Sequence, residues 1–285
     1  MAMKNNQESG DNSTNLQAGG DIVINNTKAV ALYSVEEVAK QLLNSVFGEL
    51  PTNTKGLIEN NQKSYFQALS EKIGTIIKQN EELEGIINSP DFQYISKKAA
   101  ISASRSSSIE LHKNLSTLIV QRINNDNEDL KRIVYDEAIS TINKLTNDQL
   151  KILTLCFLIK RTKLNGITNI AQFNNYLESR IKPFIDFKGT TAEFEHLVYT
   201  GCASINSILV HDLAGLFKEN YPEVFTDKNT PEKILSENET AIKLMSVWKD
   251  TQIQNMNLTS VGIVIASTYY EQMTGDRINI DIWIN

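Results

Sequence analysis

The sequence predicts a mainly α-helical protein with a short β-forming tail at its beginning and a strand at its end. Through most of the chain, apolar residues recur three or four positions apart, as they do on one face of a helix. The first residues are instead rich in Gly, Asn, Ser and Gln, and isoleucines alternate with other residues at the end. We therefore divide the chain into a low-complexity tail (1–30), a helical region (31–145) and a second helical region that ends in a strand (146–285).

The tail contains an imperfect ten-residue repeat, in which Gly10-Asp11 and Gly20-Asp21 are each followed by an asparagine at the same spacing. Gly-Asp steps let a chain turn sharply, and the residues between them can lie extended. Two repeats are too few to bury a core, so we expect other copies of the chain to supply further strands. The residues that we expect to oligomerise combine stackable amide side chains with an apolar triplet. They are Asn15, Gln17, Asp21, Ile22, Val23, Ile24 and Asn25.

A disordered tail is the alternative, because low-complexity composition and terminal position both predict it. For the isolated chain we favour disorder. In the assembled state, an ordered strand and a flexible tail both remain open. Only a test of the oligomer can distinguish them.

Capping signals and apolar faces place the first helices. Ser34 and Glu37 form a capping box, and apolar residues follow at helical spacing until the break at Gly48. A second helical face runs from Tyr65 to Ile77. We expect these two segments to form a hairpin of helices.

The middle of the first helical region predicts three further helical segments. The first begins at Asp91, and we expect it to be interrupted at 102–108, where serines compete with helix hydrogen bonds. Ile109–Ile123 and Leu130–Leu145 follow, separated by a short polar stretch. Such a short connection predicts antiparallel neighbours.

The second helical region opens with the N-cap cluster Thr146-Asn147-Asp148. The helix that follows, Leu150–Ile159, is apolar on nearly all sides, and we expect it to lie at the centre of the core. Helices also fit Ile170–Ile185, with a break at Pro183, and the long stretch Thr191–Tyr221.

The last residues predict a helix followed by a strand. Thr259 and Ser260 cap a helix that runs to Met273, and Gly275 supplies its stop. Alternating isoleucines then predict a terminal strand over 278–284. This order is similar to the end of a winged-helix module, although a wing needs a second strand.

Composition favours a cytoplasmic protein. The formal net charge of −6 argues against a surface built to neutralise phosphates, so nucleic acid is not the expected partner. Cys156 and Cys202 both lie among apolar residues, and we expect them to be small core residues in a reducing compartment. The first residues are too polar for a signal peptide. No apolar stretch approaches the roughly 20 residues that span a bilayer, so we predict no transmembrane segment.

Three stretches of the sequence resemble an uncharacterised family of bacterial proteins: Gly10–Ile22, Lys144–Leu150 and Leu258–Asn285. The resemblance covers most of the chain and implies no active site. The tail also resembles the Gly/Asn/Gln-rich adaptor segments, some of them amyloid-like, that join sensors to effectors in bacterial immune systems. This second resemblance implies a place in antiphage defence.

The tightest cluster of potential metal ligands lies in the segment from His196 to Asp212. Zinc accepts these ligand types. However, His196 and Cys202 are six residues apart and therefore lie on different faces of a helix, and no HExxH or CxxC spacing is present. We therefore predict no metal and no cofactor, and leave the catalytic residues unassigned. The cluster comprises Glu193, Glu195, His196, Cys202, His211 and Asp212.

A small basic region is formed by Lys97, Lys98 and Arg105. We interpret it as a solvated helix face balanced by nearby glutamates, with an anion site as the alternative.

Three classes of function follow from these observations. We favour a non-enzymatic self-assembling or partner-binding protein that acts as a signalling or effector component of antiphage defence. A metal-dependent hydrolase that uses the His196 to Asp212 region is one alternative. A winged-helix-like nucleic-acid binder, in which Arg277 contributes to binding, is the other.

Overall fold

The computed structural model describes residues 51–76, 85–86, 89–125, 128–206, 208, 212–226 and 229–284. The predicted helix from Ser34 to Gly48 and all seven predicted oligomerisation residues lie outside this part of the chain. They are Asn15, Gln17, Asp21, Ile22, Val23, Ile24 and Asn25.

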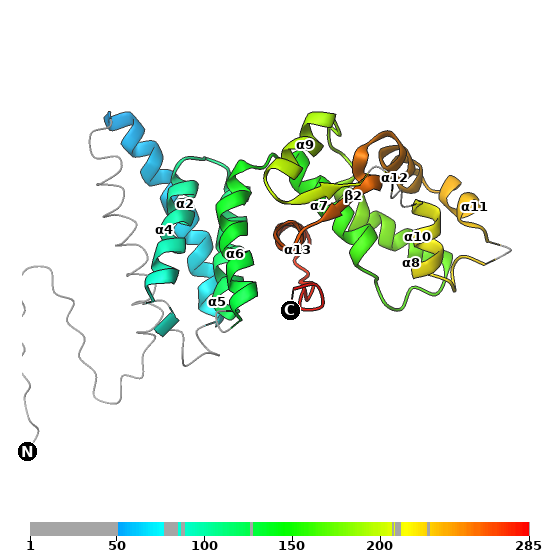
Figure 1. Ribbon diagram of the computed structural model, residues 1–285, viewed down its shortest axis with the longest axis horizontal. Coiled ribbons are helices and arrows are strands. Elements are labelled where there is room, and N and C mark those ends of the chain that lie inside the picture. The colour runs from blue at the N-terminus through cyan, green and yellow to red at the C-terminus, as the bar shows by residue number, and fades with distance from the viewer. Residues whose placement is uncertain are drawn as a thin grey trace, which may run out of the picture.

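Helices dominate the described residues, as predicted. The first four pack together: α2 (Thr52–Ile76), α4 (Pro90–Ser104), α5 (Ile109–Asn124) and α6 (Asp129–Thr141). Helix α5 contacts the other three, and residues on all of its sides are buried. These helices stand side by side in Figure 1.

Serine side chains begin two of these helices. The Ser89 hydroxyl accepts a hydrogen bond from the backbone N–H of Phe92 at 3.2 Å, at the start of α4. The Ser108 hydroxyl accepts one from the N–H of Leu111 at 3.2 Å, at the start of α5. The predicted break among the serines is confirmed, and it is the loop 105–108. Ser108 in this loop caps the helix that follows.

In the rest of the chain, α7 (Asn147–Arg161) and α13 (Ser260–Thr274) are long buried helices of 15 residues each, and the other described elements are shorter. The other elements in chain order are η1 (Ile142–Lys144), α8 (Ile170–Tyr176), the π-helical turn η2 (Leu177–Ile181), η3 (Lys182–Phe184), α9 (Thr191–Tyr199), β1 (Ala203–Ile205), α10 (Leu213–Asn220), α11 (Pro231–Ser236), α12 (Glu239–Asp250), η4 (Gln252–Asn255) and β2 (Met256–Leu258).

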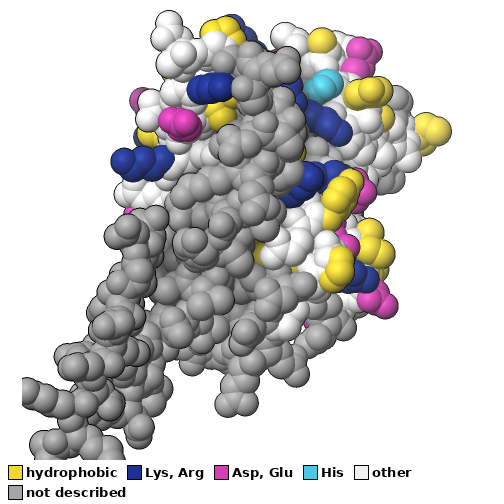
Figure 2. All heavy atoms as spheres, turned by 90° about the vertical axis from the view of Figure 1, so that its left-hand side faces the viewer, with side chains coloured by type: hydrophobic (Ala, Val, Ile, Leu, Met, Phe, Trp, Pro, Cys, Tyr) yellow, Lys and Arg dark blue, Asp and Glu magenta, His cyan; other side chains and the backbone are white. Residues whose placement is uncertain are grey.

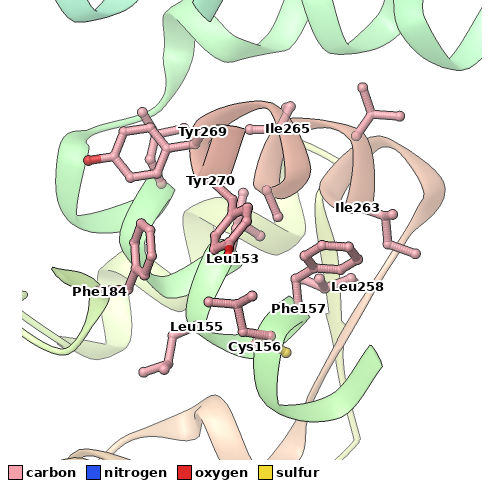
Figure 3. Packing of buried hydrophobic residues seen from close by; sticks show 14 of the residues in the cluster. Leu153, Leu155, Cys156, Phe157, Phe184, Leu258, Ile263, Ile265, Tyr269 and Tyr270 are labelled. Carbon is pink, nitrogen blue, oxygen red and sulfur yellow. The ribbon is translucent and has the colours of Figure 1, made fainter. Parts of the chain in front are cut away.

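Helix α7 is the predicted core helix. Every residue from Leu150 to Ile159 is buried except Lys151. Thr146 and Gln149 form the capping box that begins it. Its main packing partner is α13, and Figure 3 shows side chains of the two helices interleaved, including Phe157 and Tyr270. Helix α13 also contacts α5 and α6, so it joins the first four helices to α7.

The prediction of helices throughout Thr191–Tyr221 is wrong in the middle of this stretch. Helix α9 ends before Gly201, whose φ of 74° lies in the left-handed region that favours glycine. The chain then forms β1, which pairs antiparallel with β2, so that Ala203 lies opposite Leu258. The partner strand is distant in sequence, and local periodicity contains no information about it.

The end of the chain confirms one prediction and contradicts the next. Helix α13 begins with Thr259 as its N-cap and ends at Gly275, whose φ is 77°. The predicted strand over 278–284 does not form; residues 281–283 make a turn instead. The N–H of Trp283 donates to the carbonyl of Ile280 at 3.0 Å, and this turn directs Ile282 to solvent. The winged-helix interpretation therefore lacks the terminal strand on which it depended.

The terminal segment is held by side-chain packing instead of a β ladder. Ile280 and Ile284 are buried, and the Trp283 ring lies edge-on to Phe157 with centroids 5.2 Å apart. We expect Trp283→Ala to lower the free energy of unfolding by about 2 kcal/mol in urea denaturation, because a half-buried ring and an aromatic pair are lost. The neighbouring Ile282→Ala is the control and should change it by less than about 0.5 kcal/mol. Equal losses in the two variants would contradict this packing.

Both cysteines are free and buried, as predicted. No described helix is long and apolar enough to cross a membrane.

Candidate functional site: a polar pocket between α4, α5 and α7

A cavity of about 510 Å³ lies where the end of α4, the start of α5, η1 and the start of α7 meet. Two cationic side chains line it, Arg105 and Lys144, and most of the other lining groups are hydroxyls and amides. The described side chains that line it include no carboxylate. We refer to this cavity as the junction pocket. Its polar lining includes Ser102, Ser106, Ser108, Ser140, Asn143 and Asn147.

The loop that carries Arg105 is held from below by His112, which is buried in α5. Its Nε2 lies 2.8 Å from the carbonyl oxygen of Ser106 and 3.1 Å from that of Ala103, and its Nδ1 lies 3.0 Å from the Ser64 hydroxyl. Since carbonyls only accept hydrogen bonds, we assign the proton to Nε2 and let Nδ1 accept from Ser64. His112 thus connects α2 and the end of α4 to the loop that carries Arg105.

The sequence showed no partner for His112, because its partners lie in other elements and two of them are backbone carbonyls. Its function in the structure is to fix the shape of the pocket wall. Both ring nitrogens of His112 have hydrogen-bond partners, and the side chain does not line the cavity. The cationic residues Arg105 and Lys144 are therefore the charged groups that a ligand would meet.

Another part of the pocket lining comes from η1 and the start of α7. The amide of Asn143 donates to the Ser102 hydroxyl at 2.8 Å and so joins η1 to α4. Thr146 then caps α7: its hydroxyl accepts from the N–H of Gln149 at 3.1 Å. Lys144 lies between Asn143 and Thr146 in the chain and also lines the pocket.

The electrostatics of the junction pocket favour an anion. Neither Arg105 nor Lys144 forms an ion pair with a carboxylate of the described residues. The N-terminal turns of α5 and α7 open at the pocket, and helix N-termini carry partial positive charge. The acidic residues of these turns, Glu110 and Asp148, do not line the cavity. The pocket is therefore a local site of positive potential on a chain of net charge −6.

The predicted basic region is divided by the structure. Lys98 lies on the outer face of α4, with its Nζ 4.8 Å from the centroid of the Tyr94 ring. Arg105 instead lines the junction pocket with Lys144, a pairing that joins residues far apart in sequence. Figure 2 shows Lys and Arg side chains at several places on one face, some of them next to carboxylates.

The predicted cluster of metal ligands has another arrangement in the structure. His196 Nδ1 lies 2.9 Å from the amide nitrogen of Gln149, and the carboxylate of Glu193 accepts from the Thr146 hydroxyl at 3.2 Å. Cys202 is buried, and its burial raises the pKa of the thiol. His211 lies outside the described residues. Among the residues described, no group of three His, Cys, Asp or Glu side chains could hold a metal ion.

Glu193 and His196 therefore contact Thr146 and Gln149, the two residues that form the capping box of α7. The side-chain amide of Gln149 also donates a hydrogen bond to the backbone carbonyl of Glu193 at 3.1 Å, which joins α9 to the start of α7.

A protein-family model matches residues 30–242 and 225–284 of the chain. The matched residues contain the Lys144–Leu150 stretch and nearly all of the terminal one, and they begin after the Gly10–Ile22 stretch. No curated protein and no solved structure gives a match. Since the matches cover far more than half of its length, the chain belongs to this uncharacterised protein family.

Proposed function

We propose that this chain is a non-enzymatic, self-assembling protein that binds a partner and serves as a signalling or effector component of antiphage defence. The repeated Gly-Asp steps and the apolar triplet Ile22-Val23-Ile24 carry the proposal. A polar segment with two turn-forming repeats gains a covered apolar surface only by pairing with other copies. The likeness of this tail to adaptor segments of bacterial immune systems supports the biological setting by analogy.

The helical body supports a binding role over a catalytic one. Its junction pocket is lined by Arg, Lys, Ser and Asn side chains, which bind and orient a ligand. Neither described histidine lines the pocket. His112 is hydrogen-bonded to Ser64 and to the carbonyl of Ser106, and His196 contacts Gln149. In this proposal the tail clusters the bodies, and the bodies meet the partner in the cytoplasm.

A pair of charge substitutions tests the assembly role of the tail. The double variant Ile22→Asp/Ile24→Asp should reduce the mass measured by light scattering from that of an oligomer to the 32.0 kDa of one chain. The physical reason is that stacking copies would bring the new carboxylates together in an apolar contact.

The matched control is Ser13→Asp/Thr14→Asp, which adds the same charge to the tail outside the apolar triplet. It should retain the oligomer. A wild-type chain that is monomeric throughout the accessible concentration range would refute the assembly role, as would an oligomer that persists unchanged in Ile22→Asp/Ile24→Asp.

A further inference from the structure

We propose that the junction pocket binds a small phosphate-bearing molecule, with Arg105 and Lys144 both contacting the phosphate. This inference goes beyond self-assembly and does not depend on the tail. It begins from the composition of the pocket, which combines two cations with hydroxyl and amide groups and has no carboxylate among its described lining.

The charge of a phosphate group matches this lining. A phosphate monoester carries about −1.5 to −2 charges near neutral pH and has three strong acceptor oxygens. Arg105 can donate two parallel hydrogen bonds to such a group, and Lys144 can add a point charge on a flexible stem. Both side chains are solvent-exposed, so binding does not require the removal of a buried ion from an existing partner.

The preformed backbone adds a donor. Ser108 begins α5 and Asn147 begins α7, and both residues line the pocket. The N–H of Asn147 meets no acceptor among the described residues, whereas the N–H of Gln149 is satisfied by Thr146. The N–H of Ser108 already donates to the Ser106 hydroxyl at 3.2 Å. The N–H of Asn147 is therefore the donor that can reinforce the two cations, which remain the main attraction for the anion.

The size and the polarity of the pocket favour an organic phosphate over the free anion. A volume of about 510 Å³ is within the range of sites that hold small organic ligands. Inorganic phosphate would leave much of it filled by water. The side chains of Ser102, Ser106 and Asn143 would then contact hydroxyl groups of the remainder of the ligand.

A ligand in this position would join two parts of the fold. Arg105 belongs to the end of α4, and Lys144 belongs to η1, which leads into α7. In the free protein, the Asn143 to Ser102 hydrogen bond is a direct polar link between these walls. A bound phosphate would add charge-assisted links, so ligand binding should stabilise the folded chain by mass action.

The test uses the full chain and three probes: inorganic phosphate, ribose 5-phosphate and ribose. Ionic strength is held constant with sodium chloride, because exposed cations are sensitive to screening. At about 10 mM, ribose 5-phosphate should raise the Tm in a thermal-shift assay, and titration calorimetry should give its Kd. Ribose should have no effect, because it lacks the anion.

Arg105→Gln/Lys144→Gln should weaken ribose 5-phosphate binding by at least about tenfold, because both charge-assisted contacts are lost. The substituted side chains are exposed, so circular dichroism should show an unchanged fold. The matched control, Lys218→Gln/Lys233→Gln, removes the same charge from exposed positions in α10 and α11 and should bind like the wild type.

The probes also separate two sources of the phosphate group. Tighter binding of ribose 5-phosphate than of inorganic phosphate supports an organic phosphate, and equal binding supports the free anion as the ligand of the same site. The proposal is overturned if neither anion binds the wild type, or if Arg105→Gln/Lys144→Gln binds as tightly as the control variant.

Discussion

Gly262→Ala is expected to lower the free energy of unfolding by about 3 kcal/mol or more, because the first turn of α13 lies directly on another segment of backbone. A Cβ atom at Gly262 would be 2.0 Å from the carbonyl oxygen of Cys202 and 3.0 Å from its carbonyl carbon. Alanine is the better helix former by about 1 kcal/mol, but this gain is small beside such an overlap.

The surrounding hydrogen bonds prevent an easy adjustment. The N–H of Thr259 donates to the same Cys202 carbonyl at 3.1 Å, and the Thr259 hydroxyl donates to the carbonyl of Gly201 at 2.6 Å. The adjacent residues, Ala203 and Leu258, are paired in the two-stranded sheet. Moving α13 away would therefore break its cap and disturb the sheet together.

Gly56→Ala in α2 provides a control of opposite sign. A Cβ atom there meets nothing within 4 Å, and alanine should raise the free energy of unfolding by about 0.5 to 1 kcal/mol. Urea denaturation followed by circular dichroism measures both variants. A Gly262→Ala protein as stable as the wild type would show that α13 does not rest on the Cys202 backbone.

Arg122→Met is expected to cost about 3 kcal/mol, because it removes a fully buried charge that links three helices. The Arg122 guanidinium pairs with Asp91 of α4 through Nη2 and with Asp136 of α6 through Nε, the latter at 3.2 Å. It also lies over the Phe92 ring, 5.7 Å from the centroid. Methionine replaces part of the volume, so the main loss is the charge and its hydrogen bonds.

The pH dependence of the variant identifies the cause. Burial already raises the pKa of Asp136, while Arg122 opposes this rise. Without Arg122 the pKa of the Asp136 carboxyl should rise further, so the folded state binds more protons than the unfolded chain. Stability lost at neutral pH should then be partly recovered as the pH falls towards the pKa of an unfolded aspartate, about 3.9.

Arg132→Met is the matched control in the same cluster. Arg132 pairs with Asp91 at 2.8 Å and with Asp129 at 3.2 Å, but its side chain is partly exposed and both carboxylates are accessible. Its removal should cost less than about 1 kcal/mol. Equal losses for the two arginines, or a loss for Arg122→Met that does not change with pH, would refute the role of the buried charge.

Local signals in the sequence were sufficient for the helices that they border. The N-cap cluster Thr146-Asn147-Asp148 predicts the start of α7, and Thr259 with Gly275 predicts the limits of α13, because a cap depends on residues within one helical turn. The apolar surface of Leu150–Ile159 likewise predicts a central helix, since a helix that is apolar all round must be buried. The helical character and the core of the protein follow from such short-range patterns.

The same patterns failed where a segment depends on a distant partner. Alternating isoleucines predict a strand over 278–284, but neither of the two described strands pairs with this segment, and it packs as a turn on α7 and the rest of the core. Ala203–Ile205 becomes a strand because β2 lies beside it. Pairing of strands requires two segments to meet, and neither segment encodes that meeting alone.

The sequence by itself determined the helical fold class, the caps, the buried cysteines and the repeated polar tail. Only the tertiary structure decided that Arg105 and Lys144 share a pocket, that His112 holds its loop, and that Arg122 is enclosed by carboxylates from two other helices. The physical reason is the range of the interactions. Caps and periodicity act over a few residues, whereas a pocket and a buried ion pair exist only when packing brings distant side chains together.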